Sequence, residues 1–171
     1  MPRVNTAKKN KGGTKRNCRR CGGEIKPGEK YFYYKFRYGP TFYHCVAHYP
    51  KPSDLTRSKM SAAYAAIETA DAEIENVRKM EDVASLPDIL ERCADEIEAV
   101  HDEYQDGLDN MPDSLREAAT ETQDKIDELE SFADSLRSVD IETEKPEDQD
   151  QEEWVIEQCD TAQGALDEFS L

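Results

Sequence analysis

The stretch that decides the fold lies near the N-terminus, where residues 18–48 read CRRCGGEIKPGEKYFYYKFRYGPTFYHCVAH. A pair of potential metal ligands stands at each end: Cys18 with Cys21, and Cys45 with His48. Thiolates and imidazoles are the usual ligands of structural zinc, which takes four of them in a tetrahedron. The pattern Cys-x2-Cys-x23-Cys-x2-His therefore predicts one structural Zn²⁺ ion held by these four side chains.

His44 is an alternative fourth ligand, because it directly precedes Cys45. Adjacent ligands are awkward for a tetrahedron, whereas the spacing of Cys45 and His48 repeats that of the first pair. His48 is therefore favoured over His44. A redox Cys-x-x-Cys would normally open a helix in a βαβ unit, but here two glycines follow Cys21 and no such unit is present.

A β-hairpin is predicted between the two ligand pairs. The run YFYYKFRY at residues 31–38 is typical of a strand, Gly39-Pro40 indicates a turn, and residues 41–43 would form the return strand. So short a finger must bury one aromatic face, and we expect Phe32, Phe36 and Phe42 to supply it.

Charge divides the chain into two parts. Residues 1–60 carry 15 Lys+Arg against 3 Asp+Glu, whereas residues 61–171 carry 7 Lys+Arg against 35 Asp+Glu. Such asymmetry indicates two modules with different partners. The first would comprise a disordered basic arm at residues 1–16, which are almost free of apolar side chains, and a zinc finger at residues 17–52.

Helical periodicity follows, so the predicted fold class is α+β, mostly α. A three-helix coiled-coil-like module is expected at 53–139, an acidic linker at 140–151 and a C-terminal helix at 152–171. Ser85 would cap the second helix, and Ser114 with Glu117 would form a capping box for the third. The narrow apolar seams predict a helical hairpin or antiparallel coiled-coil bundle. These seams are Met60, Ala63, Ile67, Ala70, Ile74 and Val77; Leu86, Leu90, Cys93, Ile97, Val100 and Tyr104; Leu115, Ala119, Thr122, Ile126, Leu129, Ala133 and Leu136; and Val155, Cys159, Ala162, Leu166 and Phe169.

Cations interleaved with aromatic residues in the finger favour nucleic acid, because phosphates take the charge while bases stack on rings. Two arginines lie between the first two ligands, and two further cations share a strand face with two tyrosines. The predicted nucleic-acid-binding residues are Arg19, Arg20, Lys35, Arg37, Tyr31 and Tyr33. Cys93 and Cys159 are expected to be small core residues, and Trp154 a packing residue or an interface anchor.

The stretch from Cys18 to Cys45 resembles small phage-encoded zinc-finger proteins of the treble-clef or zinc-ribbon type, over about residues 17–60. In these proteins the last ligand pair is usually Cys-x-x-Cys, whereas this chain has Cys45 and His48. The resemblance implies a metal-binding recognition module without catalytic activity. It does not extend to the acidic helices.

Catalysis is not expected, because four protein ligands close a zinc site and the pattern His-Glu-x-x-His is absent. We expect a soluble, cytoplasmic protein (in the host cytoplasm if viral) with no membrane partner. Its basic finger would recognise nucleic acid, and its acidic helices would mediate self-association or bind a protein. The alternative is a phage-type inhibitor or adaptor whose acidic, DNA-mimicking helices bind a host protein, with the finger purely structural.

Overall fold

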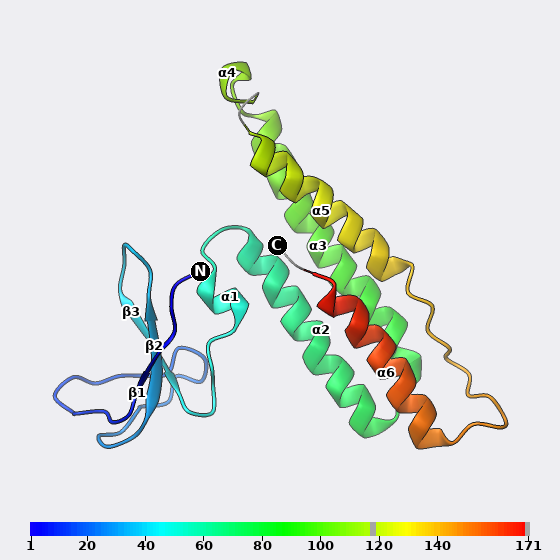
Figure 1. Ribbon diagram of the computed structural model, residues 1–171, viewed down its shortest axis with the longest axis horizontal. Helices are drawn as coiled ribbons and strands as arrows, with labels where there is room; N and C mark the ends of the chain where they lie inside the picture. Colours follow the sequence, from blue (N-terminus) through cyan, green and yellow to red (C-terminus); the bar gives the residue numbers. More distant parts are fainter. Residues whose placement is uncertain (117–118, 170–171) are drawn as a thin grey trace. The chain divides into compact units, whose positions relative to one another are not determined.

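A small antiparallel sheet followed by helices makes up the protein, which confirms the predicted α+β class (Figure 1). The computed structural model describes residues 1–116 and 119–169. The chain divides into two units, Met1–Ser61 and Ala62–Leu171. Among the described residues no helix is long and apolar enough to cross a bilayer.

The first unit is built on three strands in the order β1-β2-β3: β1 (Asn5–Ala7), β2 (Tyr31–Lys35) and β3 (Thr41–Cys45). Both neighbouring pairs are antiparallel, so the predicted hairpin of β2 and β3 is present. Tyr33 lies opposite Asn5 on one side and Tyr43 on the other, which fixes the register of the sheet. A short helix, α1 (Pro52–Leu55), follows the sheet.

The expectation of a disordered arm at residues 1–16 is wrong. β1 pairs with β2, whose backbone groups would otherwise form an open edge. Asn10 is only 4% exposed, and its side-chain amide donates to the Ile25 carbonyl at 2.7 Å. Its side-chain oxygen accepts from Arg16 Nη1, also at 2.7 Å. The amino-acid composition did not predict this ordered segment, because backbone pairing and a buried side-chain amide hold it in place rather than apolar side chains.

The aromatic core of the first unit differs from expectation. Phe32, Phe36 and Phe42 are only partly buried, whereas Tyr34 is fully buried and Tyr31 is nearly so. Tyr34 stacks on Phe42 with ring centroids 5.3 Å apart. Its hydroxyl accepts a hydrogen bond from Arg19 at 2.9 Å, so this ring can be buried without leaving its polar end unpaired.

The second unit is a set of antiparallel helices: α2 (Met60–Met80), a 3-10 turn (Val83–Ser85), α3 (Leu86–Asp109), α4 (Asp113–Arg116), α5 (Thr120–Arg137) and α6 (Gln151–Asp167). The long helices alternate in direction, and α3 and α5 pack most extensively along each other (Figure 1). α2 begins at the boundary between the units. The two cysteines of the helices, Cys93 and Cys159, lie in the core as predicted, and so does Trp154.

The buried stripe of the helices is wider than the predicted coiled-coil seam. Ile89, Ala94 and Phe132 lie outside the predicted seams but are buried, so α3 and α5 present more than two positions per heptad to the core. Conversely, the predicted seam residue Leu115 is 57% exposed. It lies in α4, which is separate from α5.

Helix boundaries differ from the prediction at two places. The helix expected from residue 53 is interrupted, because the chain is extended at Thr56 after α1. The helix expected near residue 114 begins at Thr120, and Glu117 of its predicted capping box lies outside the described residues. α6 begins where expected, and the carboxylate of Asp150 caps it by accepting from the amide of Glu152 at 2.9 Å.

Candidate metal centre

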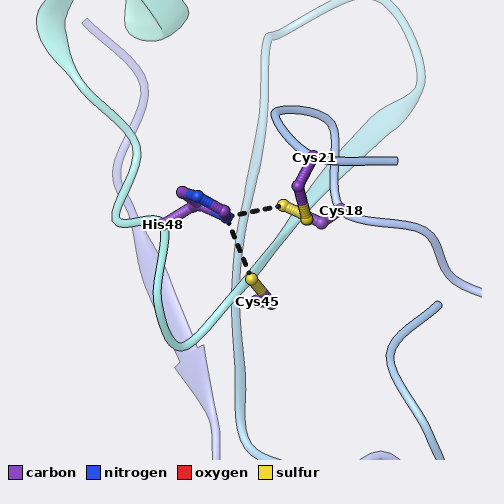
Figure 2. Close-up of side chains that lie close together, drawn as sticks. All are labelled: Cys18, Cys21, Cys45 and His48. Carbon is purple, nitrogen blue, oxygen red and sulfur yellow. Dashed lines mark hydrogen bonds between the residues drawn. The ribbon is translucent and has the colours of Figure 1, made fainter. Parts of the chain in front are cut away.

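Cys18, Cys21, Cys45 and His48 form one cluster in the first unit, with their potential ligand atoms all within 4.8 Å of one another (Figure 2). The first pair lies on a tight turn closed by the pairing of Asn17 with Glu24. Cys45 is the last residue of β3, and His48 lies in the turn that follows. Segments far apart in the sequence thus bring three thiols and one imidazole together.

Backbone hydrogen bonds shape the first ligand turn. The amide of Gly22 donates to the Cys18 carbonyl, and the amide of Cys18 donates to the Gly23 carbonyl, both at 2.8 Å. Gly22 has a φ of +70°, a backbone conformation that residues with a Cβ atom rarely adopt. A Cβ at Gly23 would lie 3.3 Å from the sulfur of Cys21. The two glycines therefore let the chain turn tightly beside the thiol.

The second ligand pair is held by its own turn. The amide of His48 donates to the Cys45 carbonyl at 3.0 Å, and Nδ1 of the imidazole lies 3.2 Å from the sulfur of Cys45 and 3.7 Å from that of Cys18. Figure 2 shows this ring edge directed toward the sulfurs. The amide of Arg19 donates to the Tyr43 carbonyl at 2.8 Å, which ties the first turn to β3.

His44 does not belong to the cluster, so the alternative fourth ligand is not supported. Successive residues of a strand point to opposite faces, and His44 therefore points away from Cys45. Its side chain is fully buried, and neither ring nitrogen has a hydrogen-bond partner among the described residues. Burial lowers the pKa of His44, which favours the neutral imidazole.

The cluster environment favours one thiolate in particular. Burial opposes ionisation of the Cys18 thiol, but hydrogen bonds to it from the backbone at Cys21, Cys45 and Arg20 outweigh that effect and lower its pKa to about 6. Burial raises the pKa of Cys45, and the neighbouring Cys18 adds to the rise. Because a metal binds thiolates, the backbone around Cys18 prepares the first ligand.

Two of the predicted nucleic-acid-binding residues take part in packing within the unit, although the side chain of Arg19 stays 46% exposed. Arg19 hydrogen-bonds Tyr34, lies 4.3 Å from the ring centroid of Phe42 and is 4.0 Å from Asp54. Tyr31 is 9% exposed, too little to offer its ring to a base. Sequence periodicity alone could not show that the sheet would use these side chains for packing.

The remaining predicted side chains are accessible. Arg20, Lys35 and Arg37 are exposed, and Tyr33 is half-buried. Tyr43, which was not among the predicted residues, is also half-buried and lies directly opposite Tyr33 on β3. The register between the strands would have identified it, but the turn sequence alone does not fix that register.

No family model, curated protein or solved structure matches this chain. The site must therefore be interpreted from its own geometry. Three thiols and an imidazole within reach of one another could hold one metal ion.

Proposed function

We propose that this protein is a non-enzymatic zinc-binding protein whose first unit recognises nucleic acid. The observation that carries the proposal is the convergence of Cys18, Cys21, Cys45 and His48 within 4.8 Å. Sulfur-rich tetrahedral sites favour Zn²⁺ over hard cations such as Mg²⁺. Four protein ligands leave no position for a reactive water, so the ion would stabilise the fold rather than catalyse a reaction.

Metal loading tests the first part of the proposal. Purified protein should contain one equivalent of zinc per chain, and Cys18→Ser should lose it. The helical signal should persist in that variant, because the helices form a separate unit. Near-ultraviolet circular dichroism, to which the tyrosines of the sheet contribute, should change. A protein that contains no zinc after purification with zinc and without chelators would overturn the assignment.

The charge of the first unit supports nucleic acid as its ligand. Its three carboxylates all have partners within the unit: Glu24 lies 3.5 Å from Lys15, Glu29 accepts from the amide of Lys26, and Asp54 lies beside Arg19. A large surplus of exposed cations remains, which would attract phosphates. These cations include Lys8, Lys9, Lys11, Arg20, Lys30, Lys35 and Arg37.

Salt dependence tests nucleic-acid binding. Fluorescence anisotropy of a labelled oligonucleotide should report binding by the zinc-loaded chain at low salt, with affinity falling as salt rises. A double variant with Lys35→Gln and Arg37→Gln removes two positive charges. Its plot of log affinity against log salt concentration should be less steep, by about 1 in slope for each phosphate that the variant no longer neutralises. Lys79→Gln, in α2 of the acidic unit, is the matched control and should change nothing. Absence of binding at low salt would refute the proposal.

The helical unit is proposed to bind a protein partner or a second copy of the chain. Several of its cations are engaged locally: Arg78 pairs with Asp160, Arg92 with Glu73, and Arg137 with three carboxylates. Most carboxylates of the unit therefore remain as uncompensated surface charge, which favours a basic partner. Sedimentation velocity over a range of protein concentrations shows whether the chain self-associates. A protein that stays monomeric at every concentration would leave binding of a different protein as the role of the helices.

A further inference from the structure

One face of the sheet carries two half-buried tyrosines, Tyr33 and Tyr43, whose rings each contact the ring of Tyr31. Strand alternation and register place Tyr33, Tyr43 and Asn5 in one row across the three strands. All three side chains are half-buried. The opposite face carries Tyr34, Phe42 and His44, and there Tyr34 and His44 are fully buried. The face with Tyr33 and Tyr43 is thus the more open of the two.

Cations flank this aromatic row. Lys35, opposite Thr41, is the next residue of β2 on the same face, and its side chain is exposed. In the other direction along the strands, the guanidinium of Arg16 lies 5.5 Å from the ring centroid of Tyr43 and 5.7 Å from that of Tyr31. Arg16 is itself fixed, because it donates to the side-chain oxygen of Asn10 at 2.7 Å. Two rings with positive charge on either side form a preorganised platform.

We infer that this face binds single-stranded nucleic acid, with unpaired bases stacked on Tyr33 and Tyr43 and the backbone phosphates near Lys35. The inference rests on the proposed function and specifies its ligand. The occupant follows from charge and ring accessibility, because a face that combines cations with partly exposed rings suits a polyanion whose bases are free to stack. In a duplex the faces of the bases are covered by their neighbours, so flat rings on a sheet gain no stacking there.

The experiment compares a labelled single-stranded oligothymidylate with a duplex of equal length, using the full-length zinc-loaded protein at low salt. Tyr33→Leu and Tyr43→Leu keep an apolar side chain but remove the ring. Each should weaken single-strand binding by roughly 5- to 150-fold, the range for one stacked base. Tyr33→Phe and Tyr43→Phe retain the ring and should bind as the parent does. Zinc content confirms that each variant is folded around its metal.

Tyr38 provides the matched control, since it is a tyrosine that is 75% exposed but lies beyond the end of β2. Tyr38→Leu should leave affinity unchanged. Three results would overturn the inference: the duplex binds as tightly as the single strand, both Leu variants bind normally, or only Tyr38→Leu loses binding. The proposed nucleic-acid function survives each of these results. Failure to bind either oligonucleotide overturns both. Self-association that the two Leu variants abolish would assign this face to a second copy of the chain and also overturn the inference.

Discussion

The two histidines beside Cys45 provide the sharpest test of the metal centre. His48 directs Nδ1 to within 3.2 Å of the Cys45 sulfur, whereas His44 is fully buried and lies outside the cluster of Cys18, Cys21, Cys45 and His48. His48→Ala removes one of four ligands. His44→Leu replaces a buried imidazole, which has no hydrogen-bond partner among the described residues, with an apolar side chain. The two variants should therefore behave in opposite ways.

The expected magnitudes follow from the roles of the two side chains. Structural zinc contributes about 10–16 kcal/mol in finger peptides, so one ligand of four accounts for roughly 3–4 kcal/mol. His48→Ala should weaken zinc binding about 100- to 1,000-fold. Leaving a buried polar group unpaired costs about 1–3 kcal/mol, so His44→Leu should leave zinc affinity unchanged and keep or slightly raise stability.

Competition with a zinc-binding dye measures the affinity, and denaturant unfolding of the zinc-loaded protein measures the stability. Unfolding should be followed by near-ultraviolet circular dichroism, since the helices dominate the far-ultraviolet signal. Retention of zinc by His48→Ala, together with its loss from His44→Leu, would refute the assigned ligand set. Loss from both variants would show that His44 supports the site by a route that the geometry does not reveal.

Three further predictions address the interiors of the two units. Chelation of the metal should make the three thiols of the first unit reactive, while the two helical thiols stay protected at pH 8, because burial raises the pKa of Cys93 to about 12 and keeps its thiolate scarce. Rapid labelling of all five cysteines while the helices stay folded would contradict this. Asn10→Ala should destabilise the first unit by about 1–3 kcal/mol in a denaturant titration, because it leaves the buried Ile25 carbonyl without its hydrogen-bond donor. Asn17→Ala removes a hydrogen bond at an exposed position and should cost clearly less in the same titration. Leu129→Ala should lower the stability of the helical unit by about 2–5 kcal/mol through a core cavity, whereas the exposed Leu115→Ala should shift the far-ultraviolet melting curve little.

The sequence was most informative where the determinants are local. The four ligands could be predicted because two short spacings and a hairpin between them encode the cluster. Ile74, Ile97 and Leu129 lie at seam positions that helical periodicity placed in the core, and they are buried. In both cases the residue type and its spacing carry the information.

Features that depend on pairing between distant segments were not predictable. The strand at Asn5–Ala7 has no apolar pattern, and it exists because β2 offers it a backbone edge. The choice of Tyr34 over Phe36 for the core depends on Arg19, which supplies a partner for the hydroxyl. The same contact holds the guanidinium of Arg19 beside the Tyr34 hydroxyl, although its side chain stays 46% exposed. Tertiary contacts determine these features, and local sequence patterns do not predict such contacts.

The place of β1 in the sheet also determines when the first unit can form during synthesis. Asn5–Ala7 leaves the ribosome well before its partner β2, which begins at Tyr31, and before the last ligand, His48. At about 5–20 residues per second, the N-terminal strand waits roughly 2–8 seconds for His48, and the first two cysteines wait roughly 1–6 seconds. During that interval the first two thiols have neither their sheet nor their full ligand set. Metal supply and thiol reduction in the cell during those seconds would therefore govern the yield of correctly folded protein.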